Sequence, residues 1–285
     1  MSFRLSRKGW IILGVAAVVA LALGVFGRVF GPHRQRFPYL NGSLAPAEYQ
    51  ALASQPGWAV RQITVAPGIR LNGLVRRPKA PDAPWVLFYQ GNDAQMLKVG
   101  QAFLSRLSAT RDWGLAIFAY RGYDSSEGVP RLPALAADAP EILAQLCATE
   151  QIDRGRVHLI GFSIGGHIAV RAMVSAARLS PRPPSLTLLA SVDDITMVPR
   201  SFYYKFDPGD DFHTSPFLAD IPAPVLVVQG TEDIALMGPG QGRAIAAALG
   251  ARARYLELPG VGHIELMENE PTLVAVREFI EAHSK

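Results

Sequence analysis

The chain is poor in cysteine and in charged side chains. Cys147 is the only cysteine among 285 residues, so an internal disulfide is excluded, and its place in the apolar pattern of a helix indicates a structural thiol. Only 18% of the residues are charged and 49% are hydrophobic, which is enough to bury one sizeable core. No zinc-type spacing of histidine or cysteine occurs, and no glycine-rich phosphate loop. We therefore expect one globular domain with no metal and no cofactor.

The net charge of +4 belongs to the N-terminal tail. Beyond residue 36 the chain holds 22 basic residues (28 less 6) against 24 acidic ones, so the globular part is slightly acidic. A basic stripe that could follow a phosphate backbone is missing, and we expect no nucleic-acid partner. The first 36 positions contain no acidic residue and six basic ones, namely Arg4, Arg7, Lys8, Arg28, Arg34 and Arg36.

A long apolar run occupies residues 9–27, which are 19 residues without a charge. A helix of this length just spans the hydrocarbon core of a bilayer, about 30 Å thick. We expect a transmembrane anchor over residues 9–30, after a basic tail at 1–8 and before a juxtamembrane linker at 31–58. Two alternatives stay open: a cleaved signal peptide, because Ala20-Leu21-Ala22 resembles a cleavage site, and a buried N-terminal helix of the fold.

The orientation of this single-pass segment is only weakly encoded. Basic residues flank both of its ends, so the positive-inside rule does not decide between the two orientations. We expect the N-terminus to lie inside and the globular domain on the extracytoplasmic side.

Strand and helix patterns alternate through residues 59–285. Val60–Val65 and Ile69–Arg76 alternate in polarity around a Pro67-Gly68 turn, which predicts an antiparallel hairpin. Short apolar runs separated by helical spacings then predict a mostly parallel central sheet with helices on both faces, an α/β fold. The predicted strands are Trp85–Tyr89, Leu115–Tyr120, Val157–Ile160, Leu186–Ala190, Pro224–Gln229 and Ala253–Leu258. The predicted helices are Ala45–Ala53, Gln95–Thr110, Leu135–Thr149, Gly166–Leu179, Gly240–Leu249 and Thr272–Ala282.

An aromatic-rich segment at about 195–218 interrupts this alternation. It lies between two predicted strands, where an insertion would cover the carboxyl edge of the sheet, the edge at which such folds bind ligands. One interpretation is a short lid that lines an apolar acyl pocket, and the other is a loop that packs its own aromatic side chains. The pocket candidates are Phe202, Tyr203, Tyr204 and Phe206, with Gln90 from the loop after the first parallel strand.

The sequence Gly161-Phe162-Ser163-Ile164-Gly165 lies between a branched apolar strand and a helix. A serine at such a tight turn is pushed into strained backbone geometry with its hydroxyl exposed, and glycines two positions away let the strand and the helix pass closely. The helix N-terminus offers free N–H groups to a developing oxyanion. Ser163 is therefore the candidate nucleophile.

An acid and a base follow Ser163 in the order that is expected when such a serine turn belongs to a mostly parallel α/β sheet. Asp233 comes after the apolar strand that ends at Gln229, and His263 follows the strand that ends at Leu258. The histidine would take the serine proton, and the carboxylate would orient the imidazole. Three other acidic residues could take the role of the acid: Asp193, Asp194 and Glu232. We expect His158 and His167 to be packing residues. His213, beside Asp210 and Asp211, is a weak candidate for a metal site.

These motifs resemble the α/β-hydrolase family, and within it the membrane-anchored Bem46/ABHD12-13-17 branch of serine hydrolases. The resemblance covers about residues 60–283 and implies a triad of Ser163, Asp233 and His263. It also implies an oxyanion hole formed by the backbone amides of Ile164 and Asn92. The motifs that carry it are Tyr89-Gln90-Gly91-Asn92, Tyr120-Arg121-Gly122-Tyr123-Asp124-Ser125-Ser126-Glu127-Gly128, Gly161–Gly166, Gln229–Asp233 and Gly260–His263.

Two positions depart from that family's pattern. Gln90 stands where the family usually has histidine, and Ala119 stands where it usually has aspartate. Neither change touches the triad. The sequence therefore predicts a membrane-tethered serine hydrolase that cleaves ester or thioester bonds of small or lipid-like acyl substrates. A serine peptidase of the aminopeptidase kind and a non-catalytic protein that binds a lipid or a partner are the alternatives.

Overall fold

The computed structural model describes residues 44–92, 95–198, 212–236 and 238–284. Their centre is an eight-stranded sheet in the order β1-β2-β4-β3-β5-β6-β7-β8. Strand β2 runs antiparallel to both of its neighbours, and the pairs from β4 across to β8 are parallel. The strands are β1 (Trp58–Ala66), β2 (Ile69–Arg76), β3 (Trp85–Tyr89), β4 (Gly114–Phe118), β5 (Val157–Phe162), β6 (Leu186–Leu189), β7 (Val225–Gly230) and β8 (Ala253–Leu258).

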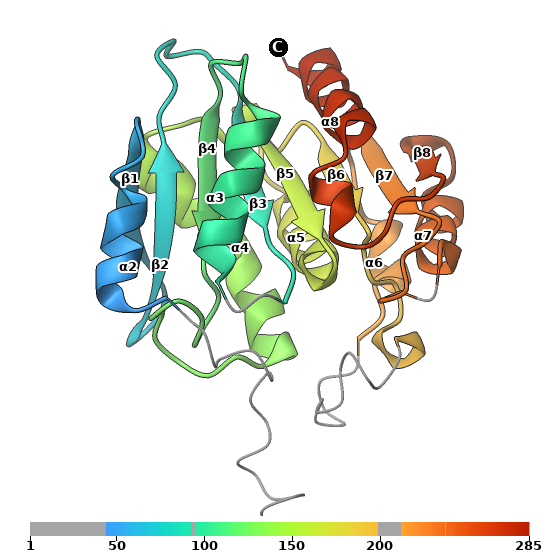
Figure 1. Ribbon diagram of the computed structural model, residues 1–285, viewed down its shortest axis with the longest axis horizontal. Helices are drawn as coiled ribbons and strands as arrows, with labels where there is room; N and C mark the ends of the chain where they lie inside the picture. Colours follow the sequence, from blue (N-terminus) through green and yellow to red (C-terminus); the bar gives the residue numbers. More distant parts are fainter. Residues whose placement is uncertain (1–43, 93–94, 199–211, 237, 285) are drawn as a thin grey trace, which may run out of the picture.

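Helices cover both faces of the sheet (Figure 1). Helices α3 (Met96–Leu107) and α8 (Glu270–His283) pack on one face, and α4 (Leu132–Glu150), α5 (Ile164–Ala176) and α7 (Gly240–Leu249) on the other. Consecutive side chains of a strand point to opposite faces, so a strand covered on both sides must be apolar throughout. The shorter helical segments are α2 (Pro46–Leu52), α6 (Ser215–Leu218) and the 3₁₀ turns Arg154–Arg156, Ile195–Met197, Gly250–Arg252 and Glu265–Met267.

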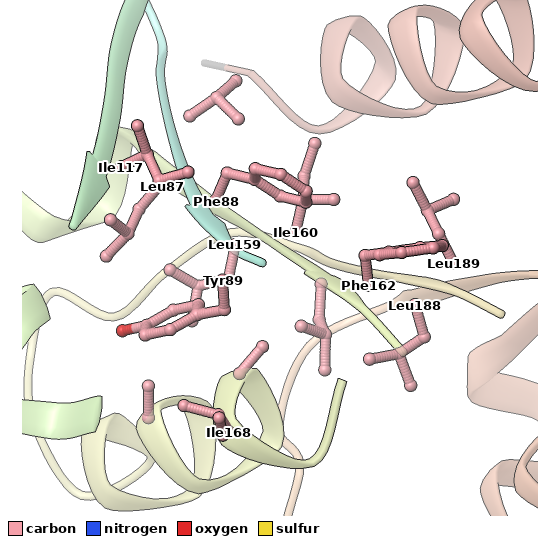
Figure 2. Close-up of a cluster of buried hydrophobic side chains, with 14 of the residues drawn as sticks. Leu87, Phe88, Tyr89, Ile117, Leu159, Ile160, Phe162, Ile168, Leu188 and Leu189 are labelled. Carbon is pink, nitrogen blue, oxygen red and sulfur yellow. The ribbon is translucent and has the colours of Figure 1, made fainter. Parts of the chain in front are cut away.

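Strand β3 shows this two-sided burial. The Phe88 ring packs against Phe103 of α3, with centroids 4.7 Å apart. The next residue, Tyr89, points to the other face, where its hydroxyl donates to the Ala139 carbonyl of α4 at 2.8 Å. Figure 2 shows Phe88 and Tyr89 leaving the strand in opposite directions within the apolar cluster. The mostly parallel sheet with helices on both faces, predicted from the sequence, is confirmed.

Two helices begin earlier than the sequence pattern indicates. Helix α4 begins at Leu132 rather than at residue 135, because Pro133 is tolerated in the first turn of a helix. Helix α5 begins at Ile164 rather than at residue 166, directly after Ser163. Strand β5 extends to Phe162, so a single residue separates this strand from the helix that follows. The turn at Ser163 is therefore tighter than predicted.

The folded unit extends upstream of the boundary at residue 59 that the sequence indicates. Leu44 and Tyr49 each expose only 3% of their surface and belong to the core. The Tyr49 hydroxyl donates to the carbonyl of Arg61 at 2.8 Å and lies 2.9 Å from that of Gly73, so it ties α2 to the β1–β2 hairpin. At least residues 44–58 of the predicted linker thus belong to the globular fold.

The described part of the chain contains no helix long and apolar enough to cross a bilayer. The segment predicted to do so, residues 9–30, lies outside the described residues, as do residues 31–43 of the linker predicted at 31–58.

His158, in the middle of β5, is a buried packing residue held in one neutral form. Its Nε2 lies 3.1 Å from the Ser284 hydroxyl, which itself donates to the Ile280 carbonyl. The Ser284 oxygen must therefore accept the Nε2 proton, and Nδ1, 2.7 Å from Ser185, is left as an acceptor. Burial, with a smaller contribution from His283, lowers the pKa of His158 from 6.5 to about 4.

This buried histidine makes stability fall in mild acid. The unfolded chain takes up a proton at His158 below about pH 6.5, whereas the folded protein resists protonation until about pH 4. The stability that the neutral imidazole contributes is therefore full above about pH 6.5 and is lost as the pH falls to about 4. We expect His158→Gln to remove about 2 kcal/mol of the decrease in unfolding free energy between pH 7 and pH 4, measured by urea titration. An unchanged pH slope in the variant would assign the acid sensitivity to other groups.

Candidate active site

The site lies where the sheet reverses its winding direction. The chain passes from β3 through α3 to β4 on one side, and from β5 through α5 to β6 on the other. The carboxyl ends of β3 and β5 are adjacent because these two strands pair in parallel. Loops that leave such a point diverge and open a crevice. Ser163 follows β5 there, and Gln90, Gly91 and Asn92 follow β3.

Ser163 has a strained backbone, with φ of 56° and ψ of −124°. Its own backbone groups are nevertheless fully used: its N–H donates to the Leu189 carbonyl at 3.0 Å, and its carbonyl accepts from Gly166 at 3.0 Å and from Val192 at 3.2 Å. Such a conformation persists only where its surroundings determine it, and such positions are concentrated at functional sites. The strained turn predicted from the sequence is present.

Three glycines make this turn sterically possible. A Cβ atom at Gly161 would lie 2.5 Å from the Gly165 carbonyl oxygen, and one at Gly165 would lie 2.1 Å from the carbonyl oxygen of Tyr89. A Cβ at Gly166 would lie 2.1 Å from the Ser191 hydroxyl. Backbone oxygens at Gly161 and Gly165, and the Ser191 side chain at Gly166, leave no room for a Cβ, which gives the glycine pattern of the sequence its physical cause.

Asp233 and His263 meet, as the sequence predicts. The His263 Nδ1 lies 2.8 Å from Asp233 Oδ2, and the aspartate is fully buried in the loop after β7. Because the carboxylate can only accept, Nδ1 carries the proton and Nε2 is left to take another. The imidazole lies beside the turn that carries Ser163, since its ring packs on Phe162 with centroids 4.9 Å apart.

Gln229, the partner that fixes this carboxylate, is missed by the sequence reasoning. Its Nε2 donates to Asp233 Oδ2 at 2.7 Å, the same oxygen that His263 reaches, and the Leu236 N–H donates to Oδ1 at 2.9 Å. Gln229 is fully buried and occupies the second-last position of β7, whose other residues are apolar or glycine. The available signal in the sequence was a polar residue near the end of an otherwise apolar, buried strand. The donors hold Asp233 in one orientation.

Ser163 and His263 line one cavity of about 480 Å³. Glu232, Glu265, Ile234 and Ile264 form part of its exposed wall, and Phe162, Ala235 and Met267 form part of its buried apolar wall. Gly91 closes the cavity beside the nucleophile, because a Cβ on it would lie 3.1 Å from the Ser163 Cβ.

The two residues predicted to supply the oxyanion hole lie at the cavity or next to Ser163 in the chain. Asn92 lines the cavity, and Ile164 is the first residue of α5, where helix N–H groups have no intrahelical partner. Within the described ranges, neither N–H donates to another group. Both donors are therefore free for a ligand oxygen.

The predicted pocket residues are not all at the cavity. Gln90 does not line it but turns inward, with only 1% of its surface exposed and no hydrogen-bond partner for its amide among the described residues. Its place directly at the end of β3 keeps the side chain under the loop rather than in the crevice. Phe202, Tyr203, Tyr204 and Phe206 lie outside the described residues.

The described ends of the aromatic segment pack away from the nucleophile. Phe212 stacks on His167 of α5 with centroids 4.3 Å apart, and Phe217 meets the same imidazole edge-on at 5.8 Å. Burial, with a smaller contribution from Arg171, lowers the pKa of His167 from 6.5 to about 3. His167 is thus a neutral packing residue, as the sequence indicates.

Two of the rival acids, Asp193 and Asp194, are committed elsewhere, whereas Glu232 lies on the wall of the cavity. Asp193 Oδ1 accepts from both the N–H and the hydroxyl of Ser215, and Asp194 caps the turn at Thr196 and lies 3.5 Å from His213. In the ranges that the structure describes, no three histidine, cysteine or carboxylate residues are grouped as a metal site would require.

Cys147 does not compete as a nucleophile. It is half-buried in α4, and burial raises its pKa to about 11, so the thiol stays protonated near neutral pH.

Comparison with known proteins supports the fold. No family model matches the chain. An uncharacterized protein of Mycobacterium tuberculosis is 28% identical over 287 residues, 97% of each chain, and an Arabidopsis thaliana α/β hydrolase domain-containing protein is 27% identical over 64% of each. The crystal structure of a thermophilic carboxylesterase from a metagenomic library superposes with a TM-score of 0.64 at 17% identity, over 82% of this chain and 92% of that one. The chain has the α/β-hydrolase fold.

The close backbone approach at the serine turn predicts an unequal response of two helical glycines. Gly165→Ala places a methyl group on the Tyr89 carbonyl, whereas a Cβ at Gly240, near the start of α7, meets nothing within 4 Å. We expect Gly165→Ala to cost about 3 kcal/mol of unfolding free energy or to prevent folding, and Gly240→Ala to change it by less than about 1 kcal/mol. Urea titration measures both. Equal stabilities would show that the turn is looser than described.

Proposed function

We propose that the protein is a serine hydrolase that cleaves ester or thioester bonds of acyl substrates through an acyl-enzyme intermediate. The observation that carries the proposal is the Asp233–His263 hydrogen bond of 2.8 Å behind an imidazole that shares its cavity with the strained Ser163. A buried carboxylate, a histidine with one fixed tautomer and a serine on a tight turn are the parts that acyl transfer requires.

In the first half-reaction Ser163 Oγ attacks the carbonyl carbon while its proton passes to His263 Nε2. The carbonyl oxygen becomes negative and accepts hydrogen bonds from the amides of Ile164 and Asn92. Asp233 stabilises the imidazolium that forms. The imidazolium then protonates the leaving alcohol or thiol, the carbon–heteroatom bond breaks, and the acyl group remains on Ser163.

In the second half-reaction water replaces the leaving group. His263 Nε2 takes a proton from the water as its oxygen attacks the acyl carbon, and the same two amides hold the oxyanion. The proton then passes to Ser163 Oγ, the acyl-enzyme bond breaks, and the carboxylic acid leaves. The fixed orientation of Asp233 by Gln229 and Leu236 means that the imidazole need not reorient between the two steps.

The walls of the cavity favour a neutral, apolar acyl group. Phe162 and Met267 are apolar, and Ile234 and Ile264 expose 74% and 62% of their surface at the rim. Glu232 and Glu265 stand at the same rim and would repel an anionic substrate. A fatty acyl ester meets both conditions, because it offers apolar surface and no charge near the carbonyl.

A tether to a membrane is part of the proposal. The apolar run at 9–27 lies upstream of Leu44, where the described chain enters the fold. The Leu44 N–H donates to Asp124 Oδ1 at 3.0 Å, and the other oxygen of Asp124 accepts from Leu97 at the start of α3. The chain therefore enters beside the loop after β3, at the edge of the sheet that carries the cavity, and a membrane anchor there would bring the exposed isoleucines near lipid.

The triad predicts a selective loss of activity. Ser163→Ala should abolish labelling by a fluorophosphonate probe, and Asp233→Asn should lower kcat for p-nitrophenyl esters by about 10⁴-fold, because the imidazole loses its orienting carboxylate. Matched controls are Ser191→Ala, another buried serine near the turn, and Asp194→Asn, the rival acid. Labelling that persists in Ser163→Ala, or a folded wild type that resists the probe and hydrolyses no ester, would refute the proposal.

The exposed isoleucines predict a dependence on chain length. In the double variant Ile234→Ser, Ile264→Ser, we expect kcat/KM to fall about tenfold for long acyl esters and to change little for acetyl esters, because only a long chain reaches the rim. Val274→Ser, which alters an exposed residue of α8 that does not line the cavity, is the control. A uniform change across the acyl series would place the acyl chain elsewhere.

A further inference from the structure

We propose that the loop of residues 120–127, here called the support loop, positions the oxyanion hole, with Tyr123 and Asp124 as its positioning residues. The inference rests on the proposed function and adds a role for a motif that the triad does not use. The support loop follows β4, whereas the amide of Asn92 follows β3. Two side chains of the support loop contact the loop after β3, and a third contacts the start of α3.

Two tyrosine hydroxyls reach the loop after β3. Tyr120 donates to the Gln90 carbonyl at 2.8 Å, and Tyr123 donates to Asn92 Oδ1 at 2.6 Å. Both tyrosines are fully buried, and their rings pack edge to face with centroids 6.2 Å apart. The Gln90 carbonyl before Gly91 and the Asn92 side chain after it are thus both fixed by hydrogen bonds from the support loop. These bonds also fix the position of the Asn92 amide.

Asp124 contacts the start of α3, the helix that follows the oxyanion loop. Its carboxylate is completely buried and accepts from the Leu97 N–H at 2.8 Å, in the first turn of α3. A carboxylate at this position also interacts favourably with the positive end of the helix. The start of α3 and the oxyanion loop, residues 90–92, are therefore bound to one rigid element.

The support loop is itself anchored. Asp124 and Ser125 have φ of 42° and 61°, a left-handed conformation that is costly for residues with a side chain. The Ser126 hydroxyl donates to the Ala119 carbonyl at 3.1 Å and accepts from the Asn72 N–H at 2.9 Å, and the Asn72 amide donates to the Asp124 carbonyl at 3.0 Å. Strands β2 and β4 thus fix the loop in a conformation that it would not adopt alone.

The position of the oxyanion loop matters because it touches the nucleophile. Gly91 approaches Ser163 so closely that a Cβ on it would lie 3.1 Å from the serine Cβ. A displaced Asn92 amide would still allow substrate to enter but would no longer meet the oxygen that becomes negative in the transition state. Loss of the support should therefore lower kcat and leave KM nearly unchanged.

Tyr123→Phe tests this role, with Tyr49→Phe as the matched control. Both variants remove the hydroxyl of a buried tyrosine, but Tyr49 bonds to Arg61 and Gly73, away from the site. For p-nitrophenyl esters we expect Tyr123→Phe to lower kcat about 10-fold to 100-fold with KM within about threefold of wild type, and Tyr49→Phe to alter both by less than about twofold.

A boronic acid inhibitor, which forms a tetrahedral anion on the serine, gives a second readout. Its affinity should fall in Tyr123→Phe in the same proportion as kcat, because both depend on the oxyanion donors. The Asn92→Ala variant removes the acceptor of the same hydrogen bond. We expect the double variant Tyr123→Phe, Asn92→Ala to lose no more activity than the more impaired single variant.

The outcomes separate the two proposals. Equal kcat in Tyr123→Phe and Tyr49→Phe, in an active wild type labelled at Ser163, would overturn the positioning role and leave the proposed function intact. The positioning role would also be overturned if the loss of activity in the double variant Tyr123→Phe, Asn92→Ala equalled the product of the losses in the two single variants. A wild type that neither hydrolyses esters nor reacts with the probe would refute the proposed function, and the positioning role with it. If Tyr123→Phe does not fold, Asn92→Ala is compared with Tyr49→Phe instead. A lower kcat with nearly unchanged KM in Asn92→Ala supports the positioning role, and equal kcat in the two variants overturns it.

Discussion

The strained backbone of Ser163 is the constraint on which the rest of the site depends. A φ of 56° at a non-glycine residue is held because the strand before it and the helix after it leave no room to relax. Glycines at 161, 165 and 166 remove the side chains that would block this approach. The same tight turn makes Ile164 the first residue of α5, so the proposed oxyanion donor directly follows the proposed nucleophile.

The other groups of the proposed site lie in loops that follow separate strands at one edge of the sheet. The loop after β7 brings Asp233, the loop after β8 brings His263, and the loop after β3 brings Asn92. Each is fixed by a partner from elsewhere in the fold: Gln229 for Asp233, Phe162 for His263 and Tyr123 for Asn92. The parallel sheet thus sets the directions, and buried polar contacts set the final positions.

The sequence was sufficient for what depends on local pattern. Apolar runs predicted β3 and β8 with their observed bounds, and the order Ser163, Asp233, His263 predicted the pair that the structure brings together. Contacts between distant segments left no such signal. A buried tyrosine has no sequence feature that assigns its hydroxyl to Asn92, thirty-one residues away.

Tertiary packing also explains two differences from the sequence interpretation. Gln90 follows a strand like a pocket residue but turns inward, and Leu44 lies in a stretch rich in proline and glycine but is buried in the core. Both are decided by neighbours far along the chain: Gly165 packs against the loop of Gln90, and Asp124 binds the N–H of Leu44. The aromatic side chains at 202–206 stay a prediction.

Trapping of the acyl-enzyme would show whether Ser163 is the nucleophile. Tryptic cleavage after Arg156 and Arg171 releases residues 157–171, in which Ser163 is the only serine. After rapid acid quenching of the protein with a p-nitrophenyl ester, the account predicts that mass spectrometry finds this peptide heavier by one acyl group, with a matching burst of p-nitrophenol. An unmodified 157–171 peptide during turnover, or an acyl group on another residue, would contradict it.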